Sequence, residues 1–127
     1  MTASTVERAR TDDVDVVLAL LEENQLPTAG LARHIATAVV AREGGRVVGS
    51  AALEIYADGV LLRSVAVAPA RQHQGLGREL TTAALQLARE LHAPAVYLLT
   101  TTAYHYFSQF GFERIARAKT ESADLRR

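Results

Sequence analysis

The sequence predicts one α/β domain built around a mixed sheet, and three observations favour this fold class. The chain has 127 residues, close to the commonest size of a single domain. Its 49% hydrophobic and 22% charged residues are typical of a folded protein with its own core. The hydrophobic pattern changes between helical spacing and strand periodicity in the order β-α-α-β-β-β-α-β-α-β. We therefore expect residues 1–127 to form a single domain.

The N-terminal half is expected to contain a strand, two helices and a hairpin. Thr11 precedes two acidic residues and apolar side chains at helical spacing, which is typical of a helix N-terminus. Pro27 interrupts that helix, and Gly44-Gly45 separates two β-rich runs. The predicted elements are a strand at 6–9, helices at 11–24 and 31–36, and strands at 38–41 and 46–56.

The C-terminal half continues with alternating strands and helices. Asp58-Gly59 predicts a two-residue hairpin turn, and Pro94 ends the amphipathic helix that Gly75 opens. Residues 96–100 are apolar and β-rich, which suits a buried central strand. The predicted elements are a strand at 60–67, a helix after Gly75, a strand at 96–100, a helix at 103–110 and a strand at 112–118.

Composition excludes several classes of function. The chain has 14 basic and 14 acidic residues, so no whole-molecule field attracts nucleic acid or an anionic membrane. It has no cysteine, which excludes disulfides, thiolate zinc sites and a cysteine nucleophile, and we expect no metal site. No apolar run approaches the 18 or so residues of a membrane span. We expect a cytoplasmic protein with neither nucleic-acid nor membrane partners.

The most informative segment runs from Val65 to Gly77. A buried strand leads into a turn punctuated by Gly75 and Gly77, which opens directly into an amphipathic helix. Such a turn points several main-chain N–H groups and the positive end of the helix dipole at one spot, where an anion binds. The spacing is neither Gly-x-Gly-x-x-Gly nor Walker A, so dinucleotide and P-loop sites are excluded.

Gln72-x-x-Gly75-x-Gly77 resembles the Gln/Arg-x-x-Gly-x-Gly/Ala loop of the GNAT superfamily of acetyl-CoA-dependent N-acetyltransferases. Residues 106–112 (YFSQFGF) resemble the family's aromatic-x-x-x-Gly-Phe signature. The resemblance implies a mixed, mostly antiparallel central sheet flanked by about four helices. Shorter matches resemble the small arsenic-resistance-associated GNAT enzymes and the acetyltransferase domain of N-acetylglutamate synthases; they lie at 26–28, 53–56, 61–67 and 97–102.

The resemblance implies acetyl-CoA as the cofactor and a set of residues that hold it. Main-chain groups of the strand would bind the pantetheine arm, the amides of the turn would hold the pyrophosphate, and Arg71 or Arg78 would meet the 3′-phosphate. The implied cofactor-binding residues are Val65, Ala66, Val67, Gln72, His73, Gln74, Gly75, Leu76, Gly77, Arg78 and Phe107.

The residue at the position of the family's usual proton donor differs in this sequence. Many members carry a tyrosine four residues before the Gly-Phe glycine, and that position is Phe107 here. The frequent asparagine after the fifth strand is also replaced, by the threonines at 100–102. A thiol with a reference pKa of about 8.5 leaves with little help. Tyr104, His105 and Tyr106 are open alternatives for the missing acid, and Tyr106 is the candidate catalytic residue.

A charged pair stands inside the predicted hairpin. If Asp58-Gly59 forms its turn, Glu54 lies directly opposite Arg63 on one face of the sheet. The pair is either a self-contained ion pair or part of the acceptor site, where Arg63 clamps a substrate carboxylate and Glu54 takes the amine proton. A β-bulge in the second strand would shift this register. Tyr56 and Thr28 are the further candidate substrate-binding residues.

The acceptor is expected to be a small amino-acid-like molecule. An α-amine, with a pKa near 7.7–8.0, is roughly a tenth neutral at pH 7, whereas a lysine amine at about 10.4 is less than a thousandth neutral. A protein or aminoacyl-tRNA amine, or a catalytically silent acetyl-CoA-binding module, are the alternatives. Residues 120–127 are too short and polar to predict a strand, so we expect an uncovered sheet edge that a homodimer covers.

Overall fold

The computed structural model describes residues 4–100, 104–115 and 123–126. Single 3-10 turns at Thr11–Asp13, Ile35–Thr37 and Pro69–Arg71 join the main elements. These elements are, in order, β1 (Ser4–Arg8), α1 (Val14–Glu23), α2 (Leu31–His34), β2 (Ala38–Glu43), β3 (Arg46–Tyr56), β4 (Gly59–Val67), α3 (Leu76–Glu90), β5 (Val96–Thr100), α4 (Tyr104–Ser108), β6 (Glu113–Ile115) and β7 (Ala123–Arg126). The predicted mixed α/β fold is confirmed.

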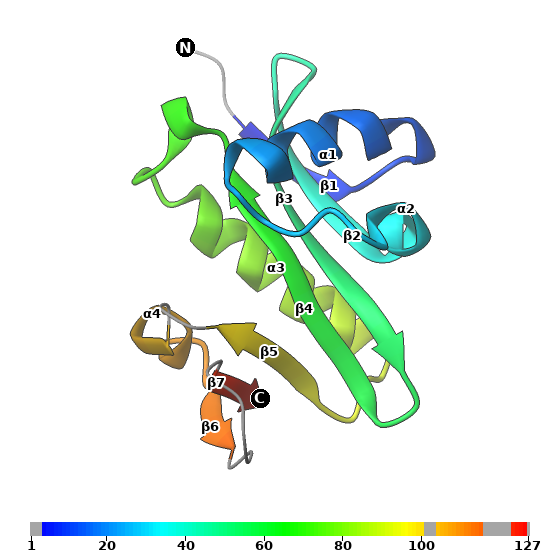
Figure 1. Ribbon diagram of the computed structural model, residues 1–127, viewed down its shortest axis with the longest axis vertical. Coiled ribbons are helices and arrows are strands. Elements are labelled where there is room, and N and C mark those ends of the chain that lie inside the picture. Colours follow the sequence, from blue (N-terminus) through cyan, green and yellow to red (C-terminus); the bar gives the residue numbers. More distant parts are fainter. Residues whose placement is uncertain (1–3, 101–103, 116–122, 127) are drawn as a thin grey trace.

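The strands of the described residues form one seven-stranded sheet in the order β1-β2-β3-β4-β5-β7-β6 (Figure 1). Only β4 and β5 pair in parallel; every other neighbouring pair is antiparallel. The parallel pair needs a crossover, and α3 supplies it. The mostly antiparallel sheet that the family resemblance implies is therefore confirmed.

The C-terminal edge differs from our expectation. Ala123–Arg126 forms β7, which lies between β5 and β6 and pairs antiparallel with both. The expectation that residues 120–127 form no strand is therefore wrong, because four of them pair between β5 and β6. The homodimer stays a prediction without this argument. The predicted strand at 112–118 is present as β6, and its last three residues fall outside the described part of the chain.

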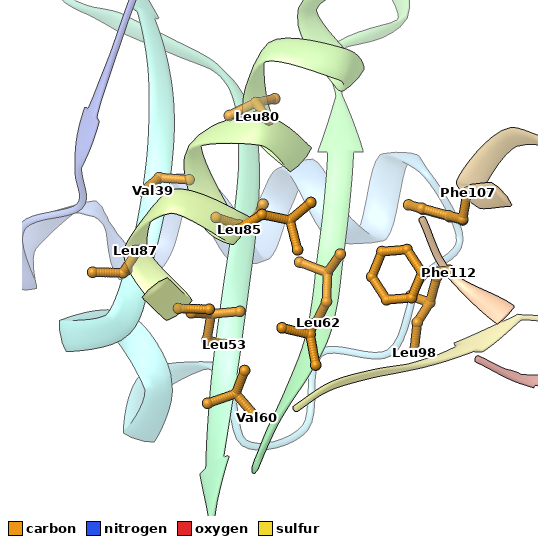
Figure 2. Close-up of a cluster of buried hydrophobic side chains, with 14 of the residues drawn as sticks. Val39, Leu53, Val60, Leu62, Leu80, Leu85, Leu87, Leu98, Phe107 and Phe112 are labelled. Atoms are coloured by element: carbon orange, nitrogen blue, oxygen red, sulfur yellow. The ribbon is translucent and has the colours of Figure 1, made fainter. Parts of the chain in front are cut away.

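Two apolar layers enclose the sheet. The helix α3 packs on one face, where Leu53, Leu62 and Leu80 are at most 1% exposed (Figure 2). The helices α1 and α2 pack on the other face, around Leu21 and Leu31. Each such leucine contributes roughly 1.5–3 kcal/mol through burial. The sheet is thus held from both sides, which fixes the positions of β3 and β4 between the helices. None of the described helices has the length and apolarity needed to cross a bilayer.

The hairpin of β3 and β4 has a different register from the predicted one. Tyr56 pairs with Gly59, so the turn is Ala57-Asp58, and Glu54 lies opposite Leu61 instead of Arg63. Gly59 is the first residue of β4, and a Cβ there would lie 2.5 Å from the Ala95 carbonyl oxygen. Its glycine therefore serves the close approach to the segment before β5 and not the turn.

A β-bulge interrupts the same pair of strands further along. Ala52 lies opposite Arg63 and Ser50 lies opposite Ala66, so β4 has one extra residue over this stretch. Ser64 adopts the left-handed conformation (φ 59°), and its carbonyl accepts a hydrogen bond of 2.8 Å from the buried Ser50 hydroxyl. The bulge that the sequence analysis considered is present, and it lies directly after Arg63.

A buried ion pair fastens α1 to the sheet and leads to a first prediction. Asp13 is 5% exposed and accepts two hydrogen bonds from the Arg42 guanidinium, one of them 3.0 Å long. We expect Asp13→Asn to lower the free energy of unfolding by about 3 kcal/mol, the lower end for a broken buried pair, because Glu7 still contacts Arg42.

The pH dependence of this effect follows from the pKa of Asp13. The hydrogen bonds from Arg42 hold that pKa below its ordinary value of 3.8. The stabilisation is therefore complete above about pH 5 and is lost as the pH falls through the folded-state pKa. Urea unfolding between neutral and acidic pH should show a smaller acid-dependent loss in Asp13→Asn than in the wild type. Equal slopes in both proteins would contradict this account.

Candidate active site

The centre of the site lies where β4 and β5 separate. They pair only over Val60–Leu62 and Val96–Leu98, and their carboxyl ends then point apart (Figure 1). The Ala68 N–H donates to the Val48 carbonyl on β3 at 2.8 Å. Because main-chain groups alternate along a strand, Val65 and Val67 direct theirs to the opposite side, which β5 has left. The Val67 carbonyl accepts hydrogen bonds from the side chains of Asn24 and Gln72, so the candidate groups for a ligand are the Val67 N–H and the main-chain groups of Val65.

The start of α3 adjoins this stretch of β4. The first bond within α3 runs from the Glu79 N–H to the Gly75 carbonyl, at 3.1 Å. The N–H groups of Leu76, Gly77 and Arg78 therefore have no partner inside the helix, and no side chain caps it. Gly75 has φ 87°, a conformation that favours glycine. Phosphate binding by this turn stays a prediction.

Gly77 lies where three elements meet. A Cβ at Gly77 would lie 3.2 Å from the Tyr106 hydroxyl of α4 and 3.9 Å from Val67 Cγ2 of β4. The strand, the helix start and α4 thus converge within contact distance of one residue. The glycine keeps the space between them clear of a side chain.

The other residues of the predicted turn have mixed roles. The Gln72 side chain donates to the Val67 carbonyl and to Asn24 Oδ1, each at 3.1 Å, so it fastens the turn to the end of α1. Asn24 also donates to the Val67 carbonyl, at 3.3 Å. Sequence reasoning missed Asn24, which has no motif around it. His73 and Gln74 are exposed, whereas Leu76 is buried in the core.

Both candidate arginines for the 3′-phosphate already have partners. The Arg71 guanidinium contacts the Glu43 carboxylate at 2.9 Å, and Arg78 Nη1 donates to Gln109 Oε1 at 3.2 Å. Arg71 would have to exchange a carboxylate for a phosphate, whereas Arg78 would exchange only a neutral amide. The geometry therefore favours Arg78 of the two.

The two neighbouring aromatic residues of α4 have different environments. Phe107 is 7% exposed and packs edge-on against Phe112, with ring centroids 6.0 Å apart (Figure 2). Tyr106 is 39% exposed, and its hydroxyl faces the first turns of α3 beside Gly77. Burial raises the pKa of the Tyr106 phenol, partly offset by its hydrogen bond with Thr81. The side chains of Tyr104 and His105 lie outside the described residues.

Phe107→Tyr tests whether the family's usual acid can be restored. The new hydroxyl would enter an apolar cluster, and a buried hydroxyl without a partner costs about 1–3 kcal/mol. We therefore expect lower stability and no increase in kcat, measured by thermal unfolding and thiol release. A rise in kcat of tenfold or more would show that position 107 reaches the departing sulfur.

A polar cluster lies on the face of the sheet that α1 and α2 cover. Glu54 and Arg63 are diagonal neighbours, and Arg63 Nη1 lies 3.0 Å from Glu54 Oε1, so the predicted ion pair exists despite the wrong register. The Tyr56 hydroxyl donates to Glu54 Oε2 at 2.5 Å. The Glu54 and Arg63 side chains are each 20% exposed. Three of the predicted acceptor-site residues are thus brought together.

The segment before α2 closes one side of this cluster. Arg63 Nη2 donates to the Ala29 carbonyl at 2.6 Å. A Cβ on Gly30 would lie 3.5 Å from Arg63 Nη1 and 3.6 Å from His34 Nε2. The Thr28 carbonyl accepts the Leu31 N–H at 3.3 Å, which places Thr28 in the same segment. Sequence reasoning missed His34, because only the fold brings α2 over β3.

The charges of the cluster stabilise one another. Hydrogen bonds from Tyr56 and then Arg63 hold the pKa of the Glu54 carboxyl below its usual value, against the opposing effect of burial. The same hydrogen bond raises the pKa of the Tyr56 phenol. Glu54 is therefore an anion, and Tyr56 a neutral hydrogen-bond donor, at neutral pH.

Comparison with known proteins places the chain in a family. Residues 34–114 match the family described as the acetyltransferase (GNAT) domain. An amino-acid acetyltransferase of Mycobacterium tuberculosis is 32% identical over 120 residues, which cover 87% of this chain and 68% of that protein.

Two solved structures have the same fold. Mycobacterium tuberculosis Rv2747, in complex with CoA and NLQ, superposes with a TM-score of 0.81 at 24% identity, over 96% of this chain and 97% of that one. N-acetylglutamate synthase from Neisseria gonorrhoeae, complexed with coenzyme A and N-acetyl-glutamate, gives 0.83 at 23% identity. The match covers 100% of this chain and 35% of the synthase chain.

The fold and the family match define an enzyme of the acyltransferase class. The chain belongs to the GNAT acetyltransferase family, whose members use acetyl-CoA.

Proposed function

We propose that this protein transfers the acetyl group of acetyl-CoA directly to the primary amine of a small amino-acid-like acceptor. The observation that carries the proposal is the paired Glu54 and Arg63 beside the point where β4 and β5 separate. Arg63 precedes Val65 by two residues, which are separated by at most about 7 Å of chain. An acceptor held at Arg63 would therefore lie within reach of a thioester held at Val65.

The donor side of the proposal uses main-chain groups. The pantetheine arm would follow Val65, Ala66 and Val67, and the pyrophosphate would lie at the start of α3. One helix end contributes only about 0.3–1 kcal/mol to anion binding, or up to ~2 when partly buried, so several amides must act together. The unpaired N–H groups of Leu76, Gly77 and Arg78 support this placement.

The acceptor side uses the charges of the cluster. A guanidinium has five N–H donors, and Arg63 spends one on Glu54, one on Ala29 and one on a longer contact with Ser64. One hydrogen on each terminal nitrogen is left for the carboxylate of an amino acid, in the bidentate geometry that guanidinium favours. Glu54 would then attract the ammonium group of the same molecule.

Tyr106 is proposed as the proton donor to the departing thiolate. Its raised pKa keeps the phenol protonated, and its hydroxyl faces the candidate donor site beside Gly77. General acid catalysis is typically worth about 10²–10⁴-fold. The name of the Mycobacterium tuberculosis amino-acid acetyltransferase supports the acceptor class that we propose.

A panel of acceptors tests the proposal. Thiol release from acetyl-CoA should be measured with α-amino acids, arsenical and phosphinothricin-like amino acids, a lysine peptide and an aminoacyl-tRNA. We expect turnover with the small acids and little with the macromolecules. Turnover with the peptide or the tRNA alone would reject the acceptor class. A homodimer, a cytoplasmic location and a role in arsenic resistance stay predictions.

A further inference from the structure

We propose that His34, which lies outside the predicted site, takes the proton that the acceptor amine must lose before it attacks the thioester. This inference rests on the proposed function, because it assigns a residue to the same reaction. It changes the role of Glu54 from proton acceptor to counter-ion of the incoming ammonium group.

The geometry of His34 leaves one nitrogen without a partner. The side chain is 15% exposed, and its Nε2 atom is buried and makes no hydrogen bond. The Glu54 Oε2 atom is 3.6 Å away, which is too far for a hydrogen bond. A buried polar atom left unpaired costs about 1–3 kcal/mol, so a ligand that pairs with it gains affinity.

A glycine lies beside this nitrogen. A Cβ on Gly30 would lie 3.6 Å from His34 Nε2 and 3.5 Å from Arg63 Nη1. A side chain at position 30 would therefore contact both the imidazole and the guanidinium. The α-carboxylate and α-amine of an amino acid are separated by one carbon atom, which suits a site with Arg63 on one side and His34 on the other.

Glu54 is poorly suited to accept the proton. One of its oxygens accepts from Arg63 and the other from Tyr56, and these hydrogen bonds lower its pKa. A general base works best when its pKa lies near the working pH. The reference pKa of imidazole is about 6.5, much closer to the 7.7–8.0 of an α-amine.

The other groups around His34 cannot take the proton. Tyr56 of β3 is a neutral phenol and a donor to Glu54, and Arg63 of β4 is permanently charged. Arg33, on the same helix as His34, is the remaining charged group near Gly30 and is also a cation. Among the groups that the structure describes here, His34 and Glu54 alone can accept a proton, and His34 is the better base.

The proposed reaction accounts for every proton and for each bond that forms or breaks. The ammonium group of the acceptor gives one proton to His34 Nε2, and its nitrogen lone pair then attacks the thioester carbonyl carbon. The carbon–sulfur bond breaks, and coenzyme A leaves as a thiolate. The new amide nitrogen loses its second proton, the thiolate gains one to become a thiol, and His34 returns its proton to solvent.

His34→Gln tests the inference, with His92→Gln as the matched control. Gln keeps a polar side chain of similar length but cannot act as a base, and His92 is exposed at the far end of α3. We expect His34→Gln to lower kcat/KM at neutral pH by about 100-fold or more, the low end for general base catalysis. Its affinity for acetyl-CoA and the activity of His92→Gln should match the wild type.

The pH profile distinguishes proton transfer from a structural role. Wild-type kcat/KM should depend less steeply on pH than that of His34→Gln, because a group of the protein accepts the amine proton. The profile of His34→Gln should keep rising until the acceptor amine itself loses its proton, near pH 8 for an α-amine. An unchanged rate and profile in His34→Gln would overturn the inference. A wild-type protein that acetylates no small amino acid would instead reject the proposed function.

A measurement on the wild type covers the case in which His34→Gln does not fold. The ¹⁵N NMR resonances of the four histidines can be followed as an accepted amino acid is added in the presence of coenzyme A. We expect the His34 Nε2 resonance to shift on binding while that of His92 stays in place. A His34 resonance that does not respond to a bound acceptor would refute the contact.

Discussion

Gly77→Val is expected to weaken the binding of acetyl-CoA by about 100-fold while the fold is retained. A valine would project from the first turn of α3 into the space that Tyr106 and Val67 border. It would keep the pyrophosphate from the N–H groups of the helix start. Each hydrogen bond to a charged group is worth about 1.5–3 kcal/mol. The loss of two such bonds, at least about 3 kcal/mol, corresponds to roughly 100-fold in affinity.

Isothermal titration calorimetry with acetyl-CoA measures this effect, and Gly77→Ala is the matched control. The methyl group of alanine would lie 3.2 Å from the Tyr106 hydroxyl, at the end of a side chain that is partly exposed. A small shift of Tyr106 accommodates it, so the alanine variant should bind nearly as well as the wild type. If Gly77→Val binds acetyl-CoA with wild-type affinity, the pyrophosphate does not lie at the start of α3.

Arg63→Ala is expected to lower kcat/KM for an amino-acid acceptor by about 100- to 1000-fold. The substitution removes the clamp on the substrate carboxylate and leaves Glu54 without its cation, so the acceptor meets an uncompensated negative charge. Together these losses amount to about 3–4 kcal/mol, at roughly 1.4 kcal/mol for each tenfold change. Acetyl-CoA binding should be unchanged, because Arg63 lies on the acceptor side of β4.

The acceptor's carboxylate provides the control for Arg63. The wild type should prefer an amino acid over the corresponding amide, and Arg63→Ala should lose that preference because it has nothing left with which to recognise the charge. Arg63→Lys should restore part of the rate but less than the full preference, since an ammonium group cannot form a bidentate pair. An unaltered preference in Arg63→Ala would remove Arg63 from the acceptor site.

The order of the elements could be predicted because it depends on local patterns. The spacing of apolar residues indicated α1 and α3, and the β-rich runs indicated β3, β4 and β5. The register of β3 and β4 could not be predicted, because it depends on the contact of Gly59 with Ala95 and on the bulge at Ser64. The polar strand β7 was missed because its pairing uses main-chain atoms, which carry no side-chain pattern.

The candidate site also contains residues that could be predicted from the sequence and residues that could not. The turn before α3 could be recognised because its glycines and its position between a strand and a helix are local features. The pairing of Glu54 with Arg63 was predicted from an incorrect register, and it exists because a diagonal contact also brings the two residues together. Asn24 and His34 were missed because they reach the site only through the packing of α1 and α2 on the sheet.

The central claim is that an amine bound at Arg63 receives the acetyl group from a donor held along β4 and the start of α3. The most direct measurement incubates the protein with acetyl-CoA and one small amino acid, and quantifies both products by mass spectrometry and thiol release. The account predicts equal amounts of free coenzyme A and of the amino acid acetylated on its α-nitrogen. Tight binding of acetyl-CoA with no acetylated product from any acceptor of the panel would contradict it, and would identify a silent binding module instead.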